Sequence, residues 1–279
     1  FKETVKAGEE IAFDTMMGFA GSVEQINAKI DTFCKPGYID AKFEEAEELA
    51  KSFTSDVKTH TAAGKFDQYI EQCYLDNFLR GGYPYVLNKD GNKSVIHLFS
   101  RKHGDPERDY NFFSIAAEYY SQGNGNFRDV SQNRRNDVFF NKDVGDFNVK
   151  TFFSLVQADG YNPLEVRPSL FDVKEGKEEE VKKYVEESID GDASAIEKIV
   201  EGKFTPGQIS NTIAKLQLEL KIDDGEFIAN ILNNCDQNIE AGFAEGYWSD
   251  HWDYNMDLVD NYLSVYPDKL NEFLFEDKS

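Results

Sequence analysis

The stretch YYSQGNGNFRDVSQNRRND, Tyr119 to Asp137, combines two glycines with asparagines, glutamines and a double arginine, and it holds almost no aliphatic side chains. This composition does not predict an ordinary core element, because it offers little apolar surface to bury. Gly123 and Gly125 permit positive φ values or close approach of the backbone to a ligand. We therefore interpret the stretch as a candidate binding segment between elements of ordinary core composition.

Within this stretch, Arg128 and Asp129 place a fork of hydrogen-bond donors beside an acceptor, which suits a pair of vicinal sugar hydroxyls. Gln132 and Asn133 add amides that both donate and accept. The alternative is that Arg128 and Asp129 form structural ion pairs with neighbouring loops, which is the commoner role of an isolated Arg-Asp dipeptide. The surrounding polar residues favour carbohydrate recognition.

Positive charge is concentrated around this stretch. Residues 97–135 carry six basic and five acidic side chains, a net charge of +1, whereas the whole chain carries −22. An anionic or strongly polar small ligand is the partner that such a local surplus predicts. A solvated loop whose charges merely cancel is the open alternative.

A second candidate segment is GYWSDHWDYNMDLVD, which ends at Asp260. It contains Trp248 and Trp252, the only two tryptophans, with Asp250 between them. Indole rings stack on sugar rings, and nearby carboxylates accept hydrogen bonds from hydroxyl groups. The alternative is that Trp252 belongs to the core and Asp250 is a helix N-cap.

Length, composition and charge limit the class of protein. A chain of 279 residues with 40% hydrophobic residues can bury a sizeable core and predicts more than one structural unit. The net charge argues against nucleic acid and anionic membrane as partners, and no apolar run approaches the roughly 20 residues of a membrane helix. Three scattered cysteines suggest neither a disulfide framework nor a zinc site and favour the cytoplasm. Because the chain begins with Phe1, we expect a piece of a longer protein.

Hydrophobic periodicity predicts a mostly α-helical chain. A short strand is expected at 11–13, and 83–140 reads as loop with short strands at 95–99 and 110–115. Thr205 as N-cap with Pro206 at the first helical position is a strong helix start. An apolar stripe through Trp252, Met256 and Val259 marks the last helix. The helices are expected at 22–33, 39–57, 66–79, from residue 146, within 173–234, and after residue 250.

The order of these segments resembles the cellobiose phosphorylase and β-oligoglucan phosphorylase group of glycoside phosphorylases. VKAGEEIAFDTMMGFAGSVEQINAKI is similar to the passage from the last sandwich strand into the linker helix, and FDQYIEQCYLDNFLRGG to the first barrel helix. FAEGYWSDHWDYNMDLVDNYLSVYPDKL is similar to a family segment with tryptophans and an acidic pair before a helix. The specific match is YYSQGNGNFRDVSQ with the family's YQSGGAYGFRDQLQ, at Tyr120, Gln122, Gly123, Phe127, Arg128, Asp129 and Gln132.

The resemblance implies a fold: the first part of an (α/α)6 barrel, with linker helices, a β-sandwich remnant at the N-terminus and a small helical insertion. The implied segments are the end of the sandwich at 1–20, the linker at 21–62, the first part of the barrel at 63–172, the helical insertion at 173–235 and the continued barrel at 236–279. An inserted loop around 83–109, the helical insertion and QNRRND depart from the compact members of the family. These extra segments fit the long oligoglucan phosphorylases better.

The resemblance also implies an activity, the reversible phosphorolysis of β-glucosides or β-oligoglucans to a sugar 1-phosphate with inversion. Inorganic phosphate is then the co-substrate, no metal or organic cofactor is needed, and a homodimer is compatible with the full-length protein. Arg128 and Asp129 would hold the glycosyl unit, with Gln132 beside them, and Trp248 and Asp250 would belong to the sugar cleft. Arg101, Lys102 and His103 would line the acceptor side or brace the inserted loop.

The family's general acid lies in a GDWNDG-like motif, which is absent here, so the acid is expected beyond Ser279 and this piece is expected to be inactive alone. Two alternatives remain: a non-catalytic carbohydrate-binding helical protein, and a glycoside hydrolase on the same barrel. The genomic sequence past Ser279 distinguishes the binding protein from an enzyme: the binding protein predicts that the gene ends near Ser279, and the enzyme predicts that the rest of the barrel follows.

Overall fold

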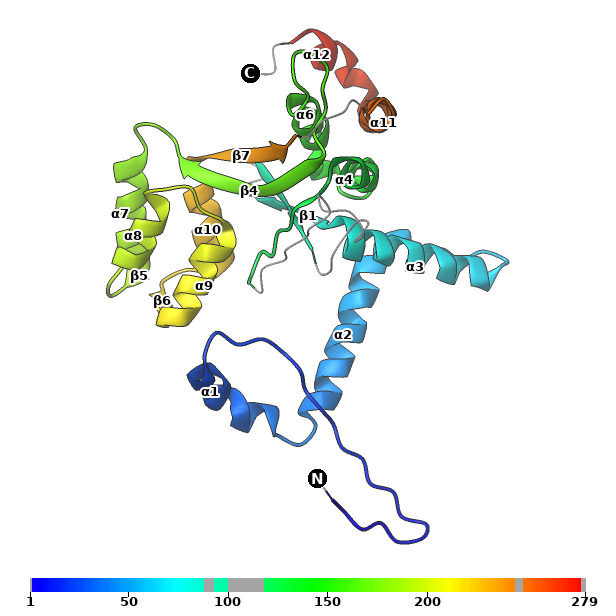
Figure 1. The fold of residues 1–279 in the computed structure, drawn as a ribbon, viewed down its shortest axis with the longest axis vertical. Coiled ribbons are helices and arrows are strands. Elements are labelled where there is room, and N and C mark those ends of the chain that lie inside the picture. Colours follow the sequence, from blue (N-terminus) through cyan, green and yellow to red (C-terminus); the bar gives the residue numbers. More distant parts are fainter. Residues whose placement is uncertain (1, 88–92, 100–117, 244–247, 277–279) are drawn as a thin grey trace. The chain divides into compact units, whose positions relative to one another are not determined.

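The computed structural model describes residues 2–87, 93–99, 118–243 and 248–276 (Figure 1). The chain divides into two compact units, Phe1–Leu75 and Asp76–Ser279. Helices dominate both, and small antiparallel sheets lie in the second. The division falls inside a helix, so it differs from the segment boundaries that the resemblance implies, which stay predictions.

The first unit is helical, and its helices begin where the local sequence predicts. The side chain of Ser22 accepts a hydrogen bond from the backbone N–H of Gln25 at 3.3 Å, which caps the first helix. Gly37, with φ 79°, makes the left-handed turn into the second helix. The elements are α1 (Val23–Phe33), α2 (Tyr38–Thr54), the 3-10 turn η1 (Ser55–Val57) and α3 (Gly64–Gly81), whose last turns belong to the second unit.

The strand predicted at Ile11–Phe13 is wrong. Residues 9–20 form neither helix nor strand, and Phe13 is 70% exposed. A strand needs a partner for its backbone N–H and C=O groups. The described part of the first unit contains only helices and connecting segments, so no partner strand is present there.

The second unit contains more sheet than the sequence predicts. A hairpin pairs β1 (Tyr83–Leu87) with β2 (Ser94–Leu98), and β2 matches the predicted strand at 95–99. A three-stranded antiparallel sheet has the order β3–β4–β7. Its strands are β3 (Gly125–Asn126), β4 (Glu165–Val173) and β7 (Cys235–Gly242). The expected strand at 110–115 lies outside the described residues.

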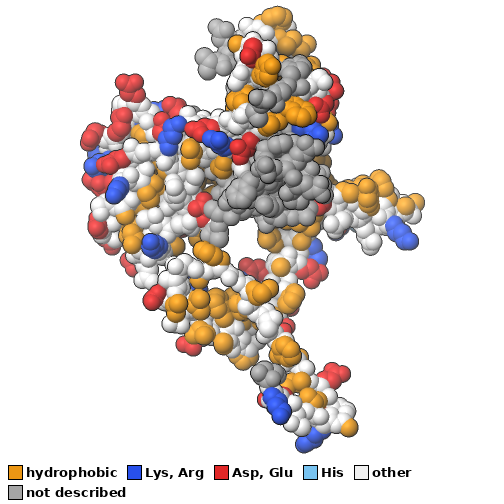
Figure 2. Space-filling view, viewed as in Figure 1, with side chains coloured by type: hydrophobic (Ala, Val, Ile, Leu, Met, Phe, Trp, Pro, Cys, Tyr) orange, Lys and Arg blue, Asp and Glu red, His pale blue; other side chains and the backbone are white. Residues whose placement is uncertain are grey.

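The small helical unit predicted at 173–234 connects β4 to β7 along the chain and lies at one end of this strand pair (Figure 1). Thr205 caps α9 and Pro206 lies in the first turn, as predicted, and the side chain of Gln208 completes a capping box. Acidic and basic side chains are scattered over the visible face of this unit, among uncharged ones (Figure 2). Its elements are α7 (Glu178–Ser188), β5 (Ile189–Asp190), α8 (Ser194–Val200), α9 (Pro206–Leu216), β6 (Glu219–Leu220) and α10 (Asp224–Leu232).

Two hydrophobic clusters hold the second unit together. The first joins the α7–α10 helices to the sheets, because Leu87 and Ile96 from the hairpin belong to the same cluster as Phe171 and Ile231. The second cluster lies among the remaining helices and includes Val166 from β4. These helices are α4 (Phe127–Arg134), α5 (Asp137–Phe140), α6 (Phe147–Ser154), α11 (Asp250–Val265) and α12 (Leu270–Phe275), with 3-10 turns η3 (Lys142–Val144) and η4 (Pro267–Lys269).

A buried polar network joins β2 to α5 and α6. Asp137 accepts a hydrogen bond from Asn148 at 2.9 Å, and its carboxylate lies 3.0 Å from Nε2 of His97. The guanidinium of Arg134 lies 5.7 Å from the centre of the Phe99 ring. Burial lowers the pKa of His97 to about 4, and Arg134 adds to this effect, although Asp137 opposes it.

This network predicts a loss of stability in mild acid. Between pH 6.5 and about 4 the unfolded chain binds a proton at His97 that the folded chain does not bind. The free energy of unfolding should therefore fall through this window, by up to about 3 kcal/mol from His97 alone, and be independent of His97 above it. Urea titrations at several pH values give the free energy of unfolding as a function of pH. Between pH 6.5 and about 4, this free energy should change less steeply with pH in His97→Gln than in the wild type. An identical slope in both proteins would contradict the assignment.

Candidate functional site

The beginning of α4 is fixed by the sheet. Asn126 ends β3, and its side chain caps the helix by accepting hydrogen bonds from the backbone N–H groups of Arg128 at 3.0 Å and Asp129 at 3.5 Å. The backbone N–H of Phe127 donates to the carbonyl of Leu164 at 2.9 Å. The strand-to-helix junction therefore places Arg128 and Asp129 in the first turn of a short, anchored helix. The prediction that this stretch is loop and not a core element is wrong, because α4 buries Phe127 and Val130 in the second hydrophobic cluster.

Neither Gly123 nor Gly125 has the positive φ value that the sequence suggested. Gly125 lies in β3 opposite Val166, in extended backbone, and does not need a positive φ. The left-handed position in this region belongs to Tyr120, with φ 52°. Gly123 and Gly125 are both buried.

Arg128 and Asp129 contact each other. Nε of Arg128 donates to Oδ1 of Asp129 at 3.3 Å, with 48% of the arginine side chain and 19% of the aspartate side chain exposed. Burial alone would lower the pKa of Arg128, but Asp129 first, then Tyr254 and Asp250, outweigh it and raise the pKa. The pair thus faces the surface and has two further polar groups of α11 within electrostatic range.

Packing of α4 against α11 brings the two candidate segments together. Arg135 pairs with Asp257, and Nδ2 of Asn261 donates to the carbonyl of Arg135 at 2.8 Å. At the other end, His251 is near Arg128 and Asp129, both of which influence its pKa. Arg128, Asp129 and Asp250 therefore gather where α4 and α11 begin.

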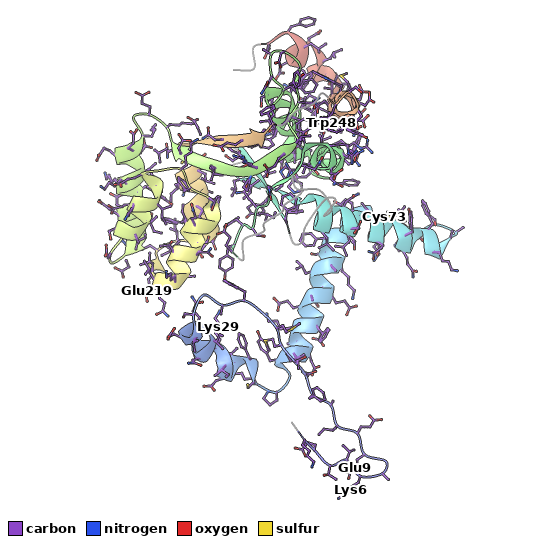
Figure 3. All side chains as sticks on the ribbon, in the orientation of Figure 1. Lys6, Glu9, Lys29, Cys73, Glu219 and Trp248 are labelled. Atoms are coloured by element: carbon purple, nitrogen blue, oxygen red, sulfur yellow. The ribbon has the colours of Figure 1, made fainter. Side chains whose placement is uncertain are left out.

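Trp248 precedes α11 and is labelled in Figure 3. Its side chain is 38% exposed, and its backbone carbonyl accepts a hydrogen bond from Nδ2 of Asn162 at 2.9 Å. Trp252 is half-buried and meets Phe153 edge-on, with ring centres 6.3 Å apart, but it belongs to neither hydrophobic cluster. Asp250 is the first helical residue and the N-cap is Ser249, so the N-cap alternative for Asp250 is wrong.

His251 is the residue of this cluster that sequence reasoning missed. It is 4% exposed, and its ring stacks between Phe127 at 5.2 Å and Trp248 at 6.2 Å. Burial lowers its pKa, while Asp250 raises it. The sequence shows His251 between the two tryptophans, but its burial depends on Phe127, which lies in a different segment.

The other predicted site residues are Gln132, Arg101, Lys102 and His103, and the structure describes only the first of them. Gln132 lies one turn after Asp129 on α4 and is half-buried. Arg101, Lys102 and His103 lie outside the described residues. We therefore define the α4–α11 site by Arg128, Asp129, Trp248, Asp250 and His251.

A separate cavity of about 880 Å³ lies among α6, β7, α11 and α12. Mainly apolar side chains line it, among them Phe153, Met256 and Phe273, and none of the residues of the α4–α11 site does. Met256 belongs to the predicted apolar stripe but is 49% exposed. The face of α11 that packs into the core instead carries His251, Asn255, Leu258, Val259 and Tyr262.

Within the described ranges, no group of three or more His, Cys, Asp or Glu side chains is placed to hold a metal ion. No helix in the described part of the chain is both long and apolar enough to cross a membrane. Comparisons with protein-family models, with curated proteins and with solved structures found no match.

Proposed function

We propose that the chain is part of an inverting glycoside phosphorylase that acts on β-glucosides or β-oligoglucans. The observation that carries the proposal is the gathering of Arg128, Asp129, Trp248 and Asp250 where α4 and α11 begin. These residues come from two segments about 120 positions apart in the chain. They supply charged donors, carboxylate acceptors and one partly exposed aromatic face, which is the combination that a sugar ring requires.

In this reaction, phosphate attacks the anomeric carbon opposite the leaving sugar, and one carboxylic acid protonates the glycosidic oxygen. A single carboxyl group suffices because phosphate takes the place of the water and base of an inverting hydrolase. Arg128 and Asp129 orient the glycosyl unit in this proposal, and Gln132 lies beside them. The general acid is proposed to lie beyond Ser279.

The reaction is tested by product analysis with the full-length protein. β-1,2-, β-1,3- and β-1,4-linked glucotrioses are incubated with and without inorganic phosphate. The proposal expects an α-configured glucose 1-phosphate that forms only when phosphate is present, and no such product from the 279-residue chain. Phosphate-independent release of glucose would instead establish a hydrolase, and saccharide binding without either product would establish a binding protein.

A further inference from the structure

His251 lies at the centre of the α4–α11 site, yet the proposed function gives it no role. Its Nδ1 is buried and has no hydrogen-bond partner among the described residues. A buried polar atom without a partner is costly, so the favourable contribution of His251 comes from the contacts of its ring and not from Nδ1. The contacts of the imidazole ring suggest what it does.

The ring of His251 forms the middle of a three-ring column. Its plane is inclined by 29° to that of Phe127 and by 18° to that of Trp248. Phe127 is fully buried and contacts Phe152 edge-on at 5.1 Å, so the inner end of the column is fixed in the second hydrophobic cluster. The outer end is the partly exposed indole of Trp248.

A column of this kind restricts the outer ring. A partly exposed indole without a backing ring can change rotamer, and binding a ligand to it then costs conformational entropy. His251 backs the ring of Trp248, and Asn162 holds its backbone carbonyl. The indole is thus held before a ligand arrives.

We propose that His251, as a neutral imidazole, is a positioning residue that holds the Trp248 indole as a stacking surface for one pyranose ring of the saccharide bound by Arg128 and Asp129. This inference rests on the proposed function, because it takes the ligand to be a saccharide. It adds a contact to the apolar C–H face of a sugar ring, beside the polar contacts to its hydroxyl groups.

The charges around His251 act on its pKa in both directions: Asp250 and Asp129 raise it, and Arg128 lowers it. Asp250 faces it from its own helix, and Arg128 and Asp129 face it from α4. Burial is the largest influence on the pKa of His251 and lowers it. The imidazole is therefore uncharged at neutral pH.

The test uses the 279-residue chain, in which Trp252→Phe leaves Trp248 as the only tryptophan, whose fluorescence is excited selectively at a wavelength that tyrosine does not absorb. Its fluorescence is titrated with the three β-linked glucotrioses. Loss of the stack in His251→Ala should weaken binding by about threefold to tenfold, the range of one aromatic contact. His251→Phe keeps the stack and should bind within about twofold of the parent.

A second readout reports the contact itself. A protonated imidazole quenches an adjacent indole, so acidification should quench Trp248 in the parent but not in His251→Phe. His251→Gln replaces His251→Ala if thermal melting shows that the alanine variant does not fold.

Three outcomes separate the two proposals. If the parent binds a glucotriose and Asp129→Asn abolishes this, but His251→Ala binds normally, only the role of His251 is wrong. Equal losses in His251→Ala and His251→Phe would also overturn it, because the imidazole nitrogens would then matter more than the ring. If the parent binds none of the three glucotrioses, both proposals fail.

Discussion

Replacing Asp129 by asparagine is expected to lower kcat/KM for phosphorolysis by about 30-fold or more in the full-length protein. In the bound complex, the proposed hydrogen bond between the Asp129 carboxylate and a sugar hydroxyl is charge-assisted and shielded from water. Removing the charged partner of such a bond costs on the order of 2 to 5 kcal/mol. Stability should change little, because the contact of Asp129 with Arg128 is a surface ion pair and its place near the helix start contributes at most about 1 kcal/mol.

Asp253→Asn is the matched control for this variant. It makes the same change of charge on an exposed aspartate in the first turn of α11. Its kcat/KM and its melting temperature should both stay close to those of the wild type. If Asp129→Asn instead lowers the melting temperature while the folded protein keeps its turnover, Asp129 serves the fold and does not hold a sugar.

The second large effect concerns the core beneath the site. Phe152 is fully buried on α6 and packs against Phe127, the residue that precedes Arg128. Phe152→Ala should lower the free energy of unfolding by about 3–5 kcal/mol, because it removes a large apolar side chain and leaves a cavity. Urea denaturation measures this loss directly.

Phe139→Ala is the control for the core variant, since Phe139 is 50% exposed. It should cost well under about 1 kcal/mol, and a folded Phe139→Ala protein should keep its saccharide affinity. A similar loss of stability in the two variants would show that the second hydrophobic cluster does not support the fold as described.

Local signals in the sequence predicted α1, α2, α3 and α9, but they missed α4 and α5, because 83–140 was interpreted as loop with short strands. The Thr205-Pro206 start needs only residues within one turn, and α9 begins there. The pairing of β4 with β7 was missed because Val173 lies opposite Cys235, on the far side of the whole helical unit. Strands that pair across such a long sequence separation leave no pattern within a few residues that would predict their pairing. Conversely, the apolar residues at 11–13 suggested a strand, but no partner strand lies in the described part of their unit.

The candidate site was predictable residue by residue but not as a cluster. Arg128, Asp129, Trp248 and Asp250 were identified from the chemistry of their side chains. Their proximity depends on the packing of α4 against α11, which the separate segments do not encode locally. His251 was missed for the same reason, because its role depends on Phe127 in the other segment.

Hydrogen exchange of the 279-residue chain, with and without a saturating β-linked glucotriose, tests most directly whether the beginnings of α4 and α11 form a saccharide site. The account predicts added protection in peptides that cover residues 126–134 and 248–256. It predicts no change in peptides from α7 to α10, which belong to the other hydrophobic cluster. Protection confined to the α7–α10 unit or to the cavity beside α12, with none at residues 126–134, would contradict it.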